Sequence, residues 1–155
     1  MSTAVEATST WADREVVAGT IVGEASAELF GGQVAVACVI RNRVMHPRWW
    51  GKTWRGVCLQ DRQFSCWNDQ LRRISDNRAQ HSTAWALALQ IADGVIGSHL
   101  PDVTLGCDHY YADYMPKPPS WATQSDGRKR VPVLKMGAHL FFRLELPDPA
   151  AAAAA

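Results

Sequence analysis

A single carboxylate stands on an apolar stripe near the start of the chain, in the segment TIVGEASAELFGG (residues 20–32). If this segment is helical, Val17, Ile21 and Glu24 lie at i, i+4 and i+7, on one helical face. Burial raises the pKa of a carboxylic acid, which then keeps a proton near neutral pH and can donate it. Cleavage of a glycosidic bond needs such a donor at the leaving oxygen. The alternative is an ordinary solvated acid, paired with Arg41 or Arg43.

Two further segments place polar groups beside aromatic rings. Gln63 and Ser65 flank Phe64 in DRQFSCWND, and amide and hydroxyl groups suit the hydroxyl and N-acetyl groups of sugars. The alternative is that this loop is merely fixed to the core by its aromatic side chains. In DHYYAD, Tyr110 and Tyr111 point to opposite faces if the segment is a strand. We therefore expect one tyrosine to pack inward and the other to face a cleft.

The histidines and cysteines lack the spacing of known metal sites, so we expect no metal and no other cofactor. His139 follows MGA and precedes two phenylalanines, and a lone histidine in such a setting is more often structural than catalytic. The sequence also has no GxSxG motif and no glycine-rich phosphate loop. These absences argue against serine-hydrolase and nucleotide-dependent chemistry.

The composition is that of a globular protein. Of 155 residues, 47% are hydrophobic and 20% are charged, and the net charge is +1. Such a balance offers no basic surface for nucleic acid. No run approaches the about 18 apolar residues that a membrane span needs. We therefore expect neither nucleic-acid binding nor a membrane span.

The elements that must position these residues can be outlined from hydrophobic periodicity and from glycine and proline. We expect helices over residues 11–25, capped by Ser9 or Thr10, and over 33–45 and 82–96. Residues 48–70 are expected to be irregular. Strands are expected at 107–113 and in a hairpin over 131–146 that turns through KMGAH, after a proline-rich loop. The order predicts an α+β fold, mainly helical, as a single domain over 11–147 with a small C-terminal β portion. Residues 1–10 are expected to form a flexible arm, and residues 148–155 a disordered, alanine-rich tail.

Two of the four cysteines flank the segment around Phe64. Cys58 and Cys66 could close a short loop by a disulfide in an oxidising compartment, whereas in a reducing one they would stay thiols. Packing of both as buried thiols is the alternative, and the sequence does not decide between them. Cys38 lies within VAVACVI and is expected in the core.

Taken together, the motifs GEA, GGQVAVACVIRNRV, QFSCWND, HYY, PPSW and MGAHLFFR occur in an order that resembles the SleB-type cell wall hydrolases. This group includes spore cortex-lytic enzymes and phage lysins, and the resemblance covers residues 16–144. It implies a lysozyme-like fold, a monomer, and the peptidoglycan glycan strand as substrate. It also implies lytic transglycosylation between N-acetylmuramic acid and N-acetylglucosamine, with Glu24 as the catalytic acid. The cleft residues that it implies are Gln63, Phe64, Ser65, Tyr110, Tyr111, Trp121 and His139.

The sequence departs from the family pattern in two places. Members usually continue GEA with arginine, where this chain has Ser26, and small neutral residues usually precede the tyrosine motif, where it has Cys107–His109. A hydrolytic muramidase or glucosaminidase, with Asp61, Asp69 or Asp108 as a second carboxylate, is one alternative. A non-catalytic sugar-binding module is another.

The first ten residues, MSTAVEATST, lack the basic and apolar regions of a signal peptide. We therefore expect synthesis in the cytoplasm and action on the cell wall after release or export, as in a phage-type endolysin.

Overall fold

Along the sequence, seven helices precede a small sheet, and one more helix follows it, within the described residues. The computed structural model describes residues 3–154. Within them, the α+β and mainly helical class expected from the sequence is confirmed. The helices are α1 (Thr3–Ala7), α2 (Asp13–Ala25), α3 (Phe30–Met45), α4 (Trp54–Cys58), α5 (Cys66–Asp69), α6 (Leu71–Ala79), α7 (Thr83–Ile96) and α8 (Pro149–Ala154). The strands are β1 (His109–Ala112), β2 (Leu134–Met136) and β3 (His139–Phe142), and a short 3₁₀ turn covers Ser120–Ala122.

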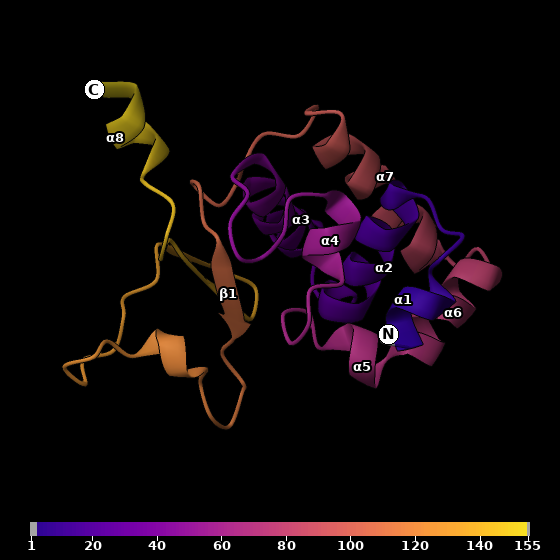
Figure 1. Cartoon of the computed structure of the whole chain (residues 1–155), viewed down its shortest axis with the longest axis horizontal. Helices are drawn as coiled ribbons and strands as arrows, with labels where there is room; N and C mark the ends of the chain where they lie inside the picture. Colours follow the sequence, from indigo (N-terminus) through magenta and orange to yellow (C-terminus); the bar gives the residue numbers. More distant parts are fainter. Residues whose placement is uncertain (1–2, 155) are drawn as a thin grey trace.

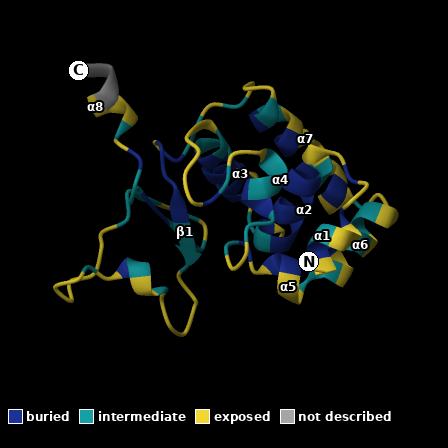
Figure 2. Cartoon of the chain, in the orientation of Figure 1, coloured by how far each residue is buried: buried dark blue, intermediate teal, exposed yellow. Residues whose placement is uncertain are grey.

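Helices α2 and α3 form the centre of the helical part. Residues 16–23 of α2 are all buried, as are residues 32–40 of α3, because both segments are apolar on nearly every side. Helices α3, α4 and α7 pack around α2, which lies deep in the assembly and dark blue in the burial view (Figures 1 and 2). Three tryptophans add edge-to-face contacts, with the ring of Trp11 6.1 Å from Trp67 and 5.9 Å from Trp85. Glu24, the candidate catalytic residue, thus lies on α2, one of the two most buried helices.

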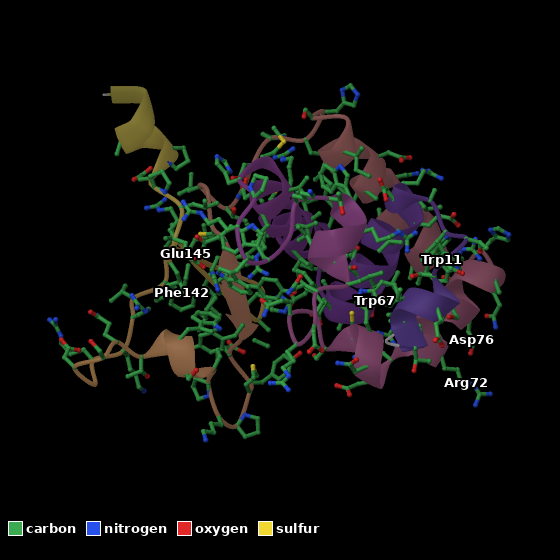
Figure 3. All side chains as sticks on the ribbon, in the orientation of Figure 1. Trp11, Trp67, Arg72, Asp76, Phe142 and Glu145 are labelled. Atoms are coloured by element: carbon green, nitrogen blue, oxygen red, sulfur yellow. The ribbon has the colours of Figure 1, made fainter. Side chains whose placement is uncertain are left out.

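The three strands form an antiparallel sheet in the order β1-β3-β2. We call the side that carries Tyr110, His139 and Phe141 the inner face, because Phe141 packs in one cluster with buried residues of α2 and α3. The outer face carries His109, Tyr111 and Phe142. Figure 1 shows β1 between the helices and the long loop that follows it, and Figure 3 places Phe142 on the side of β1 away from the helices. Strand β1 therefore presents alternate side chains to two different environments.

The ends of the chain differ from expectation. Residues 3–10, expected in a flexible arm, contain α1, and Ala4 and Thr8 are buried. The cause is Arg55 of α4, whose guanidinium donates to the carbonyl oxygens of Thr8 and Trp11. At the other end, α8 occupies most of the expected disordered tail. Residues 1–2 and 155 of these two predictions lie outside the described part of the chain.

The expected helices are present, with different boundaries. Helix α2 starts at Asp13, and Ala12, rather than Ser9 or Thr10, precedes it, with its N–H donating to Glu15 Oε1 over 3.0 Å. The glycine pair 31–32 lies in the first turn of α3 instead of before it. Residues 48–70, expected to be irregular, contain α4 and α5, and the unexpected α6 buries only Ile74. Among residues 3–154, the helices are all too short or too polar to cross a membrane.

Candidate active site

Glu24 occupies the last turn of α2 and is partly exposed. Its neighbour Gly23 lets α5 pack directly against this turn, because a Cβ there would lie 2.5 Å from the Cβ of Cys66. On the other side, Ala25 is buried in the cluster beneath the inner face of the sheet. The helix end is therefore held between α5 and the sheet, and Glu24 lies at their junction.

The environment of Glu24 favours its protonated form. Burial raises its pKa to about 7; the Tyr110 hydroxyl moderates the rise and the charge of Asp69 adds to it. The expected alternative of pairing with Arg41 or Arg43 is wrong. Arg41 donates to the carbonyl oxygen of Leu100 over 2.6 Å, and Arg43 donates to backbone and to Gln63. Within residues 3–154, Glu24 has no ion pair. With its pKa near 7, Glu24 is about half protonated at neutral pH and can exchange a proton there.

Tyr110 is the tyrosine that points inward. Its ring lies 5.1 Å from His139, 5.6 Å from Phe141 and 6.4 Å from Phe64. Its hydroxyl is buried and, in the described structure, makes no hydrogen bond of normal geometry. Burial, and then the nearby Glu24, raise the pKa of Tyr110 well above its usual value, so the hydroxyl keeps its proton. A buried hydroxyl that interacts only weakly with a neighbouring acid is costly, and a closer contact with Glu24 or with a bound substrate would lower that cost.

His139 shares the inner face with Tyr110 and is 3% exposed. Burial lowers its pKa, against the opposing charges of Glu28 and Asp113. Its Nδ1 lies 3.4 Å from Glu28 Oε1 without forming a hydrogen bond. Glu28 was not among the expected site residues. It lies just beyond the end of α2, and no pattern in the sequence near it points to this contact.

The Phe64 segment is held from two directions. Phe64 is buried against the Tyr110 ring, and Gln63 Oε1 accepts a hydrogen bond from Arg43 Nη1 over 3.1 Å. Ser65 is exposed, and its backbone oxygen accepts from the first turn of α5. Phe64 therefore adjoins the Glu24 site directly, and Gln63 is linked to it through Arg43.

Tyr111 and Trp121 lie on the outer face, away from Glu24. Tyr111 stacks on Phe142 with ring centroids 5.7 Å apart, and Trp121 meets Phe142 edge-on at 5.2 Å. Trp121 also lies 5.0 Å from His109. The structure thus divides the expected cleft residues between the two faces of the sheet, and these two aromatic residues fix the long loop to the outer one.

Asp108 is fully occupied by hydrogen bonds. Its oxygens accept from His109 Nδ1 and from the backbone N–H groups of Leu144, Glu145 and Leu146, all at 2.8–2.9 Å. Burial alone would raise its pKa, but these bonds hold the pKa below its usual range. Asp61 is largely exposed. Of the three acids considered as second carboxylates, only Asp69 influences Glu24 directly.

An open hollow of about 550 Å³ follows α6 and begins at Asp69. Arg73 lies in its wall and also donates to the carbonyl oxygen of Val22 and to Ser26 Oγ, at the end of α2. Arg72 and Asp76 of the same wall extend from the helix surface (Figure 3). A hollow lined by polar residues is therefore connected, through Arg73, to the helix end that carries Glu24.

The four cysteines are free and buried, so the thiol alternative describes Cys58 and Cys66 in the structure. Within residues 3–154, no group of three or more His, Cys, Asp and Glu side chains is arranged to hold a metal ion.

A model of the cell wall hydrolase family matches residues 27–142. The chain belongs to this family. The SleB-type resemblance seen in the motifs is thereby confirmed, and the family makes the protein an enzyme that acts on the cell wall, with peptidoglycan as the implied substrate. The matched range contains Glu28, Tyr110 and His139 but begins after Glu24. Searches of curated proteins and of solved structures gave no match.

Proposed function

We propose that this cell wall hydrolase cleaves the bond between N-acetylmuramic acid and N-acetylglucosamine by lytic transglycosylation, with Glu24 as its one acid–base group. The observation that carries the proposal is the state of Glu24. It is a partly buried carboxyl group with a pKa raised to about 7 and no ion pair within the described residues. Such a group can both give and take a proton near neutral pH.

In the first step, Glu24 donates its proton to the glycosidic oxygen. The bond between that oxygen and C1 of the muramyl residue breaks, and positive charge develops on the ring. In the second step, the Glu24 carboxylate takes the proton of the C6 hydroxyl of the same muramyl residue. The C6 oxygen bonds to C1 and closes a 1,6-anhydro ring, and Glu24 is protonated again. No water is consumed, and no second carboxylate takes part.

The neighbours of Glu24 suit this cycle. Between the two steps Glu24 is ionised, and the Tyr110 hydroxyl, which favours the ionised form, lies beside it. Asp108 does not compete for the role of a second acid, because its oxygens are held by four hydrogen bonds. The hollow along α6 offers amide and guanidinium groups to the sugar hydroxyls.

Hydrolysis is a second candidate, and one observation favours it. The charge of Asp69 contributes to the raised pKa of Glu24, so this exposed acid lies close enough to act electrostatically on the site. In a hydrolytic reaction, Asp69 would activate a water molecule or stabilise the positive ring.

Mass spectrometry of muropeptides, released from purified peptidoglycan in ¹⁸O-labelled water, separates the two reactions. Transglycosylation yields anhydromuramyl ends without label. Hydrolysis yields reducing ends that each carry one ¹⁸O atom, and Asp69→Asn should then lower the rate, with Asp61→Asn as the exposed control. Release of neither product would contradict both candidates.

We further propose the biological role of a phage-type endolysin that reaches the wall after release from the cytoplasm. Co-expression with a membrane-permeabilising protein should lyse a bacterial host, whereas the Glu24→Gln variant should not. Survival of the host with the unchanged enzyme would argue against this role.

A further inference from the structure

Glu28 joins the end of α2 to the turn between β2 and β3. Its Oε1 accepts a hydrogen bond from the backbone N–H of Ala138 over 3.1 Å, across 110 positions of sequence. Its own backbone is fixed as well: its N–H donates to the carbonyl oxygen of Ala25, and its carbonyl oxygen accepts from Gln33 Nε2. A carboxylate held this firmly is a structural connection between the helix and the sheet rather than a freely moving side chain.

The turn is shaped to receive this carboxylate. Met136 pairs with His139, which leaves Gly137 and Ala138 as a two-residue hairpin loop. Gly137 has φ +59°, as is typical of the first loop residue of a type II′ turn. A Cβ at Gly137 would lie 1.9 Å from Glu28 Oε2. Glycine is therefore required here twice, for the backbone conformation and for the approach of the carboxylate.

The position of this turn is passed on to Tyr110. Strand β3 begins at His139, directly after the turn, and pairs Ala112 with His139 and Tyr110 with Phe141. The N–H of Asp113 also donates to the carbonyl oxygen of Ala138 over 2.7 Å. Because the Tyr110 ring rests against the side chains of His139 and Phe141, the turn determines where the Tyr110 hydroxyl lies relative to Glu24.

We propose that Glu28 is a positioning residue: through its contact with the Gly137–Ala138 turn, it holds the Tyr110 hydroxyl at the Glu24 carboxyl group. This connection, which we call the Glu28 clasp, rests on the proposed function of Glu24. Glu24 and Glu28 thus divide the work between them. Glu24 exchanges protons with the substrate, and Glu28 fixes the position of the Tyr110 hydroxyl beside Glu24.

The test compares Glu28→Ala with Glu28→Gln. Glutamine keeps an oxygen that can accept from the Ala138 N–H, whereas alanine removes the clasp. Glu28→Ala should lower kcat on soluble glycan strands by about tenfold or more with little change in KM, because small misplacements of reacting groups are that costly. Glu28→Gln should restore most of kcat. An equally inactive Glu28→Gln would show that Glu28 reacts with substrate itself, and would overturn the positioning role.

Amide hydrogen exchange supplies a readout that does not depend on activity. In Glu28→Ala, the amides of Ala138 and Asp113 should exchange about tenfold faster or more, since the clasp no longer holds the turn closed. Faster exchange with an unchanged kcat would overturn the proposal, because the clasp would then be structural only. If the unchanged enzyme and Glu24→Gln are equally inactive, the proposed function fails, while exchange still tests the clasp itself.

A second pair of variants covers the case in which Glu28→Ala does not fold. Gly137→Ala drives a methyl group into the carboxylate and leaves Glu28 in place. Gly127→Ala is its matched control, because Gly127 has a positive φ of +87° but no atom within 4 Å of an added Cβ. Both carry the backbone strain of alanine at positive φ. The clasp predicts loss of kcat in Gly137→Ala alone, and equal effects of the two substitutions would overturn it.

Discussion

Each face of the sheet carries a histidine and aromatic rings and has an acid beside it, Glu24 at the inner face and Asp108 at the outer, yet the two clusters differ in how their polar atoms are paired. His109 of the outer face bonds to Asp108, which directly precedes β1, and the other acceptor sites of Asp108 are filled by backbone N–H groups. On the inner face, the Tyr110 hydroxyl and His139 Nδ1 are buried without a hydrogen bond in the described structure. Similar residue types are therefore fully hydrogen-bonded in one cluster and lack regular hydrogen bonds in the other, within the described residues.

The difference distinguishes a structural cluster around Asp108 from the proposed reactive site around Glu24. Hydrogen bonds to the ionised form hold the pKa of Asp108 low, while burial raises the pKa of Glu24 to about 7. A satisfied buried acid stabilises the fold and has no proton to give. An acid whose pKa is raised to about 7, beside buried polar groups without regular hydrogen bonds, can exchange a proton near neutral pH. The two clusters thus differ less in their residue types than in how completely their polar atoms are hydrogen-bonded.

The largest expected effect is on the inner face. Glu24→Gln should lower wall lysis by about 10²–10⁴-fold, because glutamine fills the same space but cannot exchange a proton. The melting temperature and circular dichroism should stay close to those of the unchanged protein. The measurement is clearance of purified cell walls, and lysis near the original rate would break the comparison by removing Glu24 from the chemistry.

Beside the outer face, the corresponding substitution of Asp108 should affect stability instead. Asp108→Asn replaces a charged acceptor of four hydrogen bonds and should lower the free energy of unfolding by about 3 kcal/mol. The activity per folded molecule should be retained. Urea unfolding gives the first quantity, and lysis normalised to folded protein gives the second. A stable but inactive variant would place Asp108 in the reaction.

The pH dependence of stability should differ in sign between the two acids. Glu24 holds its proton more tightly when folded, so its contribution is complete below its ordinary pKa of 4.5 and is lost as the pH rises to about 7. The change is about 3 kcal/mol at most. Asp108 behaves oppositely: its contribution is complete above 3.8 and is lost as the pH falls. In urea unfolding, Glu24→Gln should not show this loss of stability between pH 4.5 and about 7. As the pH falls below 3.8, Asp108→Asn should lose less stability than the unchanged protein.

The smallest effect compares the two adjacent tyrosines. Tyr110→Phe removes the hydroxyl beside Glu24 and should lower the rate of lysis by about tenfold, with little loss of stability because that hydroxyl makes no hydrogen bond of normal geometry. Tyr111→Phe, on the outer face, should change the rate by no more than about twofold. Equal effects of the two substitutions would show that the faces do not differ in function.

The sequence was most informative where the apolar pattern was strong. Helices α2, α3 and α7 were expected within a few residues of their observed positions because each has a continuous apolar face. Helix α6 was missed because only Ile74 is buried, which leaves too weak a pattern to recognise. In the site, the apolar stripe on α2 indicated that Glu24 is partly buried. The alternation of side chains along β1 indicated that Tyr110 and Tyr111 point to opposite faces of the sheet.

Other parts of the site depend on contacts between distant segments. Nothing near Glu28 in the sequence shows that its carboxylate meets Ala138, because the contact follows from how the hairpin rests on α2. For the same reason, Asp108 seemed as suitable a second acid as Asp69. Only the backbone of residues 144–146, which returns to Asp108 after the hairpin, fills its oxygens.

The packing of the four buried cysteines has a consequence for the redox history of the enzyme. Burial raises the pKa of Cys38, Cys58, Cys66 and Cys107, so each stays a thiol rather than the thiolate that oxidants attack. Cys66 in particular packs closely against Gly23, next to Glu24. We therefore expect the four buried thiols to stay reduced when the folded protein meets a more oxidising medium.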